Sequence, residues 1–271
     1  MLGAVHAKIG KGPIQRRRAA RAVCGTATGG GLYSVARRAG GTGQGYPDAA
    51  RMCMGEAAGG RAGLRATGSD PVIVVGAEVA EFGGAVIWGA GDVAAVEACE
   101  AYDSFHDLNP FIVILTNLEL DHVDFHGSWE NLRDSVTRFV SKIPAEGCLI
   151  YCAEDAGACE IAGRFKGRSI GYSAADLADL AGAGFTLRQK GPHNELNAAG
   201  ALTALREIGG LNDAAIRAVS DFGGAERRQQ VIYPTAAESN LGFWTLIDDY
   251  AHHPTEVAAS LRAMPRATVG L

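Results

Sequence analysis

The densest group of reactive side chains lies near the end of the sequence, in the nine residues from 248 to 256. It comprises two adjacent carboxylates, a phenol and two imidazoles: Asp248, Asp249, Tyr250, His252 and His253. Such groups move protons and orient substrates in active sites. An apolar strand is expected just before them, and Pro254 is typical of a first helical turn. We therefore interpret this strand-to-helix turn as part of a functional site.

A second group follows the most apolar run, Phe111–Leu115, and reads Thr116-Asn117-Leu118-Glu119-Leu120-Asp121-His122-Val123-Asp124. A neutral imidazole beside carboxylates suits a divalent cation, although a capping Asp next to a surface His would look the same. Glu97 ends the preceding expected strand, where a carboxylate among apolar residues needs a partner. If the two strands are neighbours, Glu97 and His122 can hold one Mg²⁺ together with water and phosphate oxygens.

Two further segments could contact a nucleotide. Asn194 and Asn197 are three residues apart at the start of a helix, so their amides face one side and can read a purine edge. Simple helix capping is the alternative for both. Arg227 and Arg228 form a guanidinium pair that suits phosphate, although such pairs also occur on solvated surfaces.

Strands and helices alternate from residue 71 onward. The expected strands are 72–75, 93–99, 111–115, 148–152, a short one around Ile170, and 243–247. The expected helices are 129–143 with Ser128 as the cap, 155–165, 194–208, and one starting near Pro254. Alternation of this kind predicts an α/β fold with a mainly parallel sheet flanked by helices. In such sheets, ligands bind beyond the carboxyl ends of the strands, where these polar groups fall.

The composition divides the chain of 271 residues into two parts. Residues 1–70 hold eleven Lys/Arg, three Asp/Glu and sixteen of the 37 glycines, with no periodic element. Their composition fits a disordered stretch or a different reading frame, and they stay unassigned. No apolar run approaches the roughly 18 residues of a membrane helix, and no secretory signal is evident, so we expect a cytoplasmic protein. Nucleic acid is not expected as a partner, because the basic part has few aromatic residues for stacking.

Taken in order, these strings resemble the Mur ligases, the ATP-dependent amide-forming enzymes of peptidoglycan synthesis. The matching strings are Glu97–Glu100 with Ser104-Phe105, Thr116–Asp124, Gly191–Asn197 and Asp248–Glu256. The resemblance covers about residues 72–264 and is strongest to the members that join L-alanine to UDP-N-acetylmuramate. It implies a central ATP-binding domain over 71–222 and the beginning of a Rossmann-like C-terminal domain over 223–271.

The resemblance also implies roles for single residues. Glu97 and His122 match Mg²⁺ ligands, and Arg228 matches an arginine that faces the ATP phosphates. His193, Asn194, Asn197 and Asp249 match nucleotide-contacting positions, whereas Tyr250 and His252 match positions near the incoming amino acid. The implied cofactors are ATP and Mg²⁺, and the implied reaction passes through an acyl phosphate.

The sequence departs from the family at one important point. The family's phosphate loop, close to GTHGKTTT, has no counterpart, so we expect this chain to have little or no ligase activity. Two other functions stay open. One is the related ligase that attaches a tripeptide to the same sugar nucleotide. The other is a metal-dependent hydrolase built on Asp121, His122, Asp124 and His126.

Overall fold

The computed structural model describes residues 32–37, 58–79, 83–91, 93–98, 100–178, 180, 185–233, 246–251 and 253–264. A seven-stranded sheet forms the centre, in the order β3-β2-β4-β1-β5-β6-β7. Its strands are β1 Leu32–Arg37, β2 Val72–Val79, β3 Gly84–Ile87, β4 Val93–Ala98, β5 Ile112–Leu115, β6 Cys148–Cys152 and β7 Ser169–Tyr172. Strands β2, β4, β5, β6 and β7 run in one direction, and β1 and β3 run against it. The predicted α/β class with a mainly parallel sheet is confirmed.

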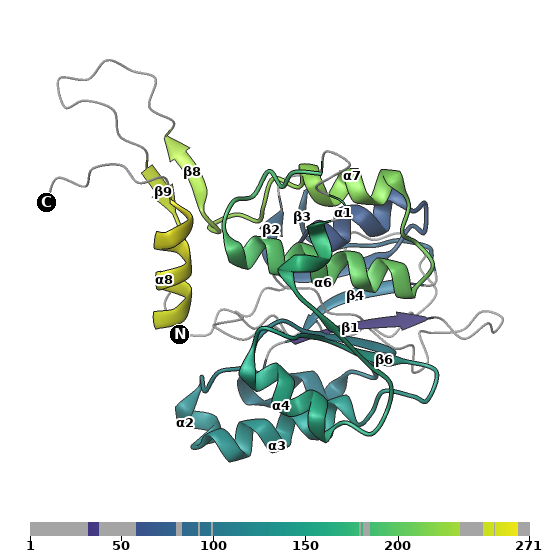
Figure 1. Cartoon of the computed structure of the whole chain (residues 1–271), viewed down its shortest axis with the longest axis vertical. Helices are drawn as coiled ribbons and strands as arrows, with labels where there is room; N and C mark the ends of the chain where they lie inside the picture. The colour runs from purple at the N-terminus through teal and green to yellow at the C-terminus, as the bar shows by residue number, and fades with distance from the viewer. Residues whose placement is uncertain are drawn as a thin grey trace, which may run out of the picture.

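Helices cover both faces of this sheet (Figure 1). One face carries α1 Ala58–Ala66, α6 Pro192–Glu207 and α7 Asp213–Asp221, and the other carries α2 Val123–His126, α3 Trp129–Val140 and α4 Ala156–Arg164. Short 3-10 turns, η2 Ala101–Asp107 and η3 Ala174–Leu177, complete the layers. With helices on both sides, β5 is buried along its whole length, which explains its continuous apolar sequence.

Local signals set the helix boundaries that the sequence predicted. Ser128 caps α3, since its hydroxyl accepts a hydrogen bond from the Asn131 amide at 3.3 Å. Asp155 caps α4 in the same way through Ala158. The interior side of α3, which includes Val136 and Phe139, is fully buried.

The expectation that residues 1–70 lack regular elements needs correction. β1 lies in the middle of the sheet, antiparallel to both β4 and β5. α1 packs against α6 and α7, and its Leu64 is fully buried. A Cβ added to Gly63 would lie 2.5 Å from Leu205 Cδ1, so this glycine lets two helices approach closely. Helix propensity argues against a glycine-rich helix, and here tertiary packing outweighs it.

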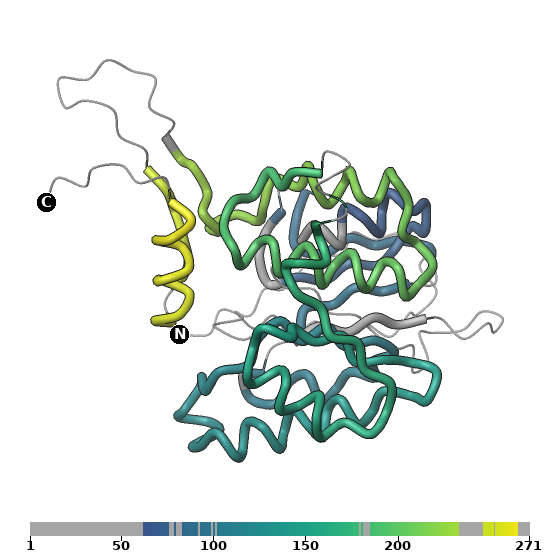
Figure 2. Tube along the Cα trace, in the orientation of Figure 1, coloured from purple at the N-terminus to yellow at the C-terminus, as the bar shows by residue number. Residues whose placement is uncertain are grey.

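A smaller unit follows the sheet domain along the chain. It consists of β8 Gln230–Tyr233 and β9 Leu246–Asp248, which pair antiparallel, and of α8 Pro254–Ala263. Figure 2 shows this unit beside the sheet, on the side where the chain leaves β4 and β5 toward η2 and α2. Of the strand predicted over 243–247, residues 243–245 lie outside the described residues.

Candidate functional site

The chemistry-bearing segments meet at the carboxyl edge of the parallel strands. Glu100 follows β4, and the loop carrying Glu119, Asp121 and His122 follows β5. The beginnings of α6 and α8 lie at the same edge, the left side of Figure 1. Segments more than 130 residues apart in the sequence are thus brought into contact.

A carboxylate–imidazole cluster forms the centre of this edge. The ligand atoms of Glu100, Asp121 and His122 all lie within 4.8 Å of one another, and His122 Nε2 is 3.8 Å from Glu100 Oε1. Glu100 is 1% exposed, and neither of its carboxylate oxygens accepts a hydrogen bond within the described residues. A buried carboxylate in this state is costly unless something compensates it.

The raised pKa of Glu100 also fits a buried carboxyl group without a hydrogen-bond partner among the described residues. The pKa of Glu100 is raised to about 8, mainly by burial; its own backbone N–H lowers it, and the negative charges of Asp121, Glu97 and Glu256 raise it. Two carboxylates and an imidazole are suitable ligands for a divalent cation. The residues present therefore fit such an ion, which would replace the missing hydrogen-bond partners of Glu100.

The backbone holds this cluster in an uncommon conformation. His122 has a φ of 48° and is the residue just before α2, and its amide donates to Asp121 Oδ1 at 2.6 Å. The His126 ring, at the other end of α2, lies with Nε2 3.1 Å from the Glu100 carbonyl oxygen. The short helix therefore fastens the loop after β5 to the end of β4.

The structure adds a second glutamate, Glu100, to the predicted cation site. The sequence assigned Glu97 to the cation together with His122; Glu97 lies near the end of β4, and its charge acts on Glu100 three residues later. The role of Glu97 as a cation ligand stays a prediction. The geometry does not support the metal-dependent hydrolase alternative. Asp124 is exposed, and the His126 ring lies against the Glu100 carbonyl oxygen. The two histidines four apart do not form one metal site here.

The start of α8 contacts the loop after β5. Thr255 Oγ1 donates to Glu119 Oε2 at 2.7 Å, and His253 Nδ1 lies 3.5 Å from the same oxygen. Glu256 accepts from the His253 amide as part of a capping box. The start of α8 and the loop after β5 thus lie side by side, with Glu256 close enough to Glu100 to act on its pKa.

His193, at the start of α6, is the third part of this edge. Burial lowers its pKa, opposed by the charge of Asp249, while the charge of Arg228 lowers it further. His193 Nδ1 is buried and has no hydrogen-bond partner among the described residues. Arg228 Nη1 lies 3.8 Å from Glu256 Oε1. His193, Arg228 and Asp249, predicted separately from the sequence, therefore lie near one another.

The remaining predicted residues are placed as follows. Asn194 Nδ2 donates to the Lys190 carbonyl at 2.9 Å, and Asn197 is buried on the same helix. The Arg227 guanidinium lies over the Tyr250 ring, 4.6 Å from its centroid. His252 lies outside the described residues.

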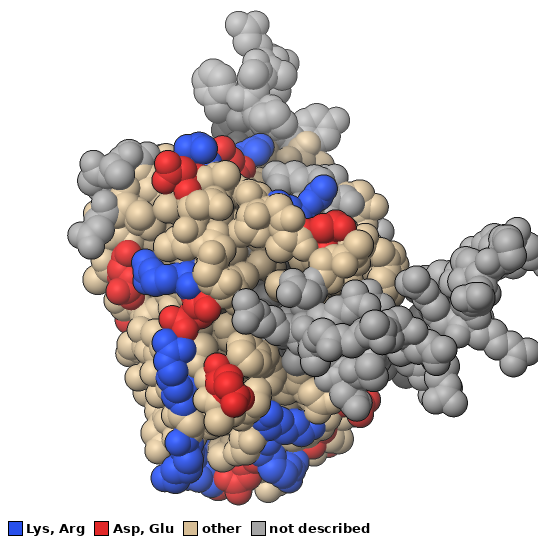
Figure 3. All heavy atoms as spheres, turned by 90° about the vertical axis from the view of Figure 1, so that its right-hand side faces the viewer, with Lys and Arg blue, Asp and Glu red and all other residues tan. Residues whose placement is uncertain are grey.

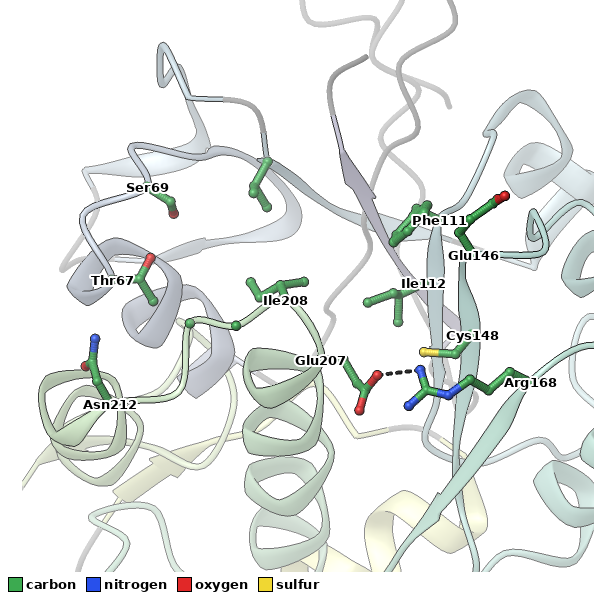
Figure 4. A pocket seen from close by; sticks show the side chains of 13 residues that line it. Thr67, Ser69, Phe111, Ile112, Glu146, Cys148, Arg168, Glu207, Ile208 and Asn212 are labelled. Atoms are coloured by element: carbon green, nitrogen blue, oxygen red, sulfur yellow. Dashed lines mark hydrogen bonds and ion pairs between the residues drawn. The ribbon is translucent and has the colours of Figure 1, made fainter. Parts of the chain in front are cut away.

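A cavity of about 500 Å³ lies at the opposite, amino-terminal edge of the strands (Figure 4). Val93, Ile112 and Cys148 line it from the first positions of their strands, and the Arg168–Glu207 ion pair lies across it. It contains none of the residues that the sequence singled out for chemistry. Where the face in Figure 3 shows described residues, positive and negative side chains are interspersed. None of the described helices could cross a membrane.

The structure is thus an α/β domain with a candidate ligand site at the ends of its parallel strands. A comparison with known families identifies this domain. Residues 90–205 match the Mur ligase middle domain. The chain belongs to the Mur ligase family.

Named relatives indicate which type of Mur ligase the chain is similar to. The chain is 37% identical over 220 residues to a UDP-N-acetylmuramate–L-alanine ligase of Arthrobacter sp., covering 74% of this chain and 46% of the relative. It is 31% identical over 228 residues to the enzyme of that name from Sorangium cellulosum, covering 76% and 47%. The chain thus spans about half the length of these relatives.

Solved structures agree on the fold. The UDP-N-acetylmuramate–alanine ligase of Thermotoga maritima superimposes with a TM-score of 0.59 at 19% identity, over 78% of this chain and 52% of that one.

Proposed function

We propose that this chain is the central part of an ATP-dependent ligase that joins L-alanine to UDP-N-acetylmuramate. The observation that carries the proposal is the convergence of the Glu100–Asp121–His122 cluster with the beginnings of α6 and α8 at one sheet edge. Such an edge is where α/β sheets bind ligands. The named relatives support the choice of substrates.

The proposed reaction has two steps. A carboxylate oxygen of the sugar nucleotide attacks the γ-phosphorus of ATP and expels ADP, which leaves an acyl phosphate. The amine of L-alanine then attacks the acyl carbon, and the phosphate departs. Catalysis of phosphoryl transfer depends mainly on positioning and on neutralising charge.

The residues of this chain would divide that work. Glu100, Asp121 and His122 would hold a Mg²⁺ ion, which when bound neutralises charge on the phosphate oxygens. Arg228 would add a guanidinium on the phosphate side, and Asn194 and Asn197 would contact the purine.

Low activity of this chain is part of the proposal. A phosphate loop follows a strand and opens a helix, so that its amides and Lys surround the phosphates. β1 occupies the centre of the sheet in the reverse direction, with Leu32 beside Leu115 and Arg37 beside Val93. The chain therefore leaves β1 at the edge away from the cluster. This direction supports the expectation from the missing GTHGKTTT string.

A chimera tests the function. In it, residues 1–70 are replaced by the matching segment of the Arthrobacter relative, and that relative's remaining C-terminal part is appended. We expect L-alanine-dependent phosphate release from the chimera with ATP, Mg²⁺ and UDP-N-acetylmuramate, and background release from the original chain. Release with the tripeptide but not with L-alanine would favour the tripeptide ligase instead. Absence of release with both acceptors would refute the proposal.

A further inference from the structure

Two exposed aromatic rings lie next to the cation cluster. Tyr102, in η2, is 70% exposed, and Phe125, in α2, is 42% exposed. Their ring centroids are 5.4 Å apart in an edge-to-face arrangement. Glu100 precedes Tyr102 by two residues, and His122 precedes Phe125 by three. The pair therefore joins the two segments that carry cluster residues.

Three residues beside this aromatic pair or within it have an unfavourable backbone conformation. Tyr102, Asp103 and His122 have φ values of 56°, 55° and 48°. This region is unfavourable for a residue other than glycine, and such residues gather at ligand-binding places. Asp103 is kept there by a short hydrogen bond from Ser135. The Tyr102 ring lies largely in water and the Phe125 ring is only partly covered, so burial in the core does not account for the placement of the pair.

We propose that Tyr102 and Phe125 bind the apolar face of the pyranose ring of the acceptor sugar nucleotide. The proposal rests on the proposed function. In N-acetylmuramate the reacting carboxylate is attached to the ring through a short lactyl ether. With that carboxylate at the cluster, the ring must lie within a few bonds of it, where the aromatic pair lies. The pair then orients the carboxylate toward the cluster.

An adenine ring is the competing occupant of an aromatic surface. We favour the sugar, because the resemblance implies that the purine contacts Asn194 and Asn197 at the beginning of α6. Helix α6 covers one face of the sheet, whereas α2 lies on the other (Figure 1). The helices that carry Phe125 and the two amides thus lie in opposite layers.

Saturation-transfer difference NMR on the full chain with Mg²⁺ tests the proposal, since it detects weak binding without turnover. The probes are UDP-N-acetylmuramate and ATP, titrated separately. Tyr102→Asn removes the ring while suiting the positive φ, and Phe125→Ala removes the other ring. Tyr102→Phe keeps an aromatic face. Trp88→Ala is the matched control, because Trp88 is 72% exposed and follows β3 at the far edge of the sheet.

We expect transfer to the pyranose protons in the original chain. Tyr102→Asn and Phe125→Ala should each weaken UDP-N-acetylmuramate binding by roughly three- to tenfold. Tyr102→Phe and Trp88→Ala should leave it unchanged, and circular dichroism melts confirm that each variant is folded. Unchanged sugar-nucleotide binding in both ring-removing variants would overturn this inference alone. Loss of ATP transfer instead would assign the rings to adenine. No sugar-nucleotide binding by the original chain would overturn the proposed function as well.

Discussion

Replacing Glu100 by Gln should change how the free energy of unfolding depends on pH. The pKa of Glu100 rises from 4.5 to about 8 in the folded chain. Between these values the folded state holds a proton that the unfolded state has released. The free energy of unfolding therefore falls as pH rises, by about 1.4 kcal/mol per pH unit. Below pH 4.5 the effect vanishes, and above pH 8 it is constant.

The magnitude follows from the shift. At pH 7 the cost of the buried carboxyl group reaches about 3 kcal/mol, and above pH 8 about 5 kcal/mol. Glu100→Gln has no such proton, so its free energy of unfolding relative to the original chain should rise by these amounts from pH 4.5 upward. The buried amide of Glu100→Gln lacks a hydrogen-bond partner, which changes the free energy of unfolding by the same amount at every pH. The slope against pH is therefore the quantity to compare.

Urea denaturation with EDTA, at pH values from 5 to 8.5, measures this slope. Glu97→Gln is the comparison variant: Glu97 lies in β4 and acts on Glu100 through its charge alone, so a smaller change of slope is expected. Parallel curves for Glu100→Gln and the original chain over this range would refute the assigned burial of Glu100. A larger change of slope in Glu97→Gln would show that Glu97, not Glu100, is the costly buried acid.

Two other variants test how the elements are held. Thr255→Val removes the hydrogen bond to Glu119 and should weaken the attachment of α8 by about 1 kcal/mol. Amide hydrogen exchange in α8 should then be faster, and an unchanged rate would mean that this contact does not hold the helix. Gly63→Ala places a methyl group against the Leu205 Cδ1 end, which costs roughly 1–3 kcal/mol, while the better helix propensity of Ala offsets about 0.5–1 kcal/mol. The free energy of unfolding should therefore fall by about 1 kcal/mol, whereas a rise would show that α1 and α6 are not in close contact.

Long apolar runs and caps made the middle of the fold predictable. The strands at 112–115 and 148–152 and the helix capped by Ser128 lie where the sequence placed them. Their side chains are buried on both faces or along one helix face, and burial of that kind leaves a direct pattern in the sequence. The agreement of four motifs also located the edge at which they meet.

Other elements left no such pattern. α1 depends on glycine for close packing against α6, and glycine lowers its own helix propensity. β1 pairs through its backbone between two strands that follow much later in the chain, which local periodicity does not encode. α7 is short, with Ala215 and Val219 as its buried side chains.

The choice between Glu97 and Glu100 shows the same limit at the site. Both glutamates stand in one EACE string, and spacing alone does not say where the strand ends. In the structure β4 ends at Ala98, so Glu100 lies past the sheet edge and faces His122, while Glu97 stays within the ladder. The Asp121 neighbour of His122 is visible in the sequence, but the burial of Glu100 is not, because it depends on where the strand ends. The role of Glu97 at the cation stays a prediction.

Manganese binding to this chain tests the central claim most directly, because Mn²⁺ replaces Mg²⁺ and free Mn²⁺ is counted by electron paramagnetic resonance. We expect a Mn²⁺ site that Mg²⁺ displaces, that is lost in Glu100→Gln and in His122→Ala, and that is kept in Glu97→Gln. Binding that survives both cluster variants, or that disappears in Glu97→Gln alone, would contradict the assignment of Glu100, Asp121 and His122 as the cation site.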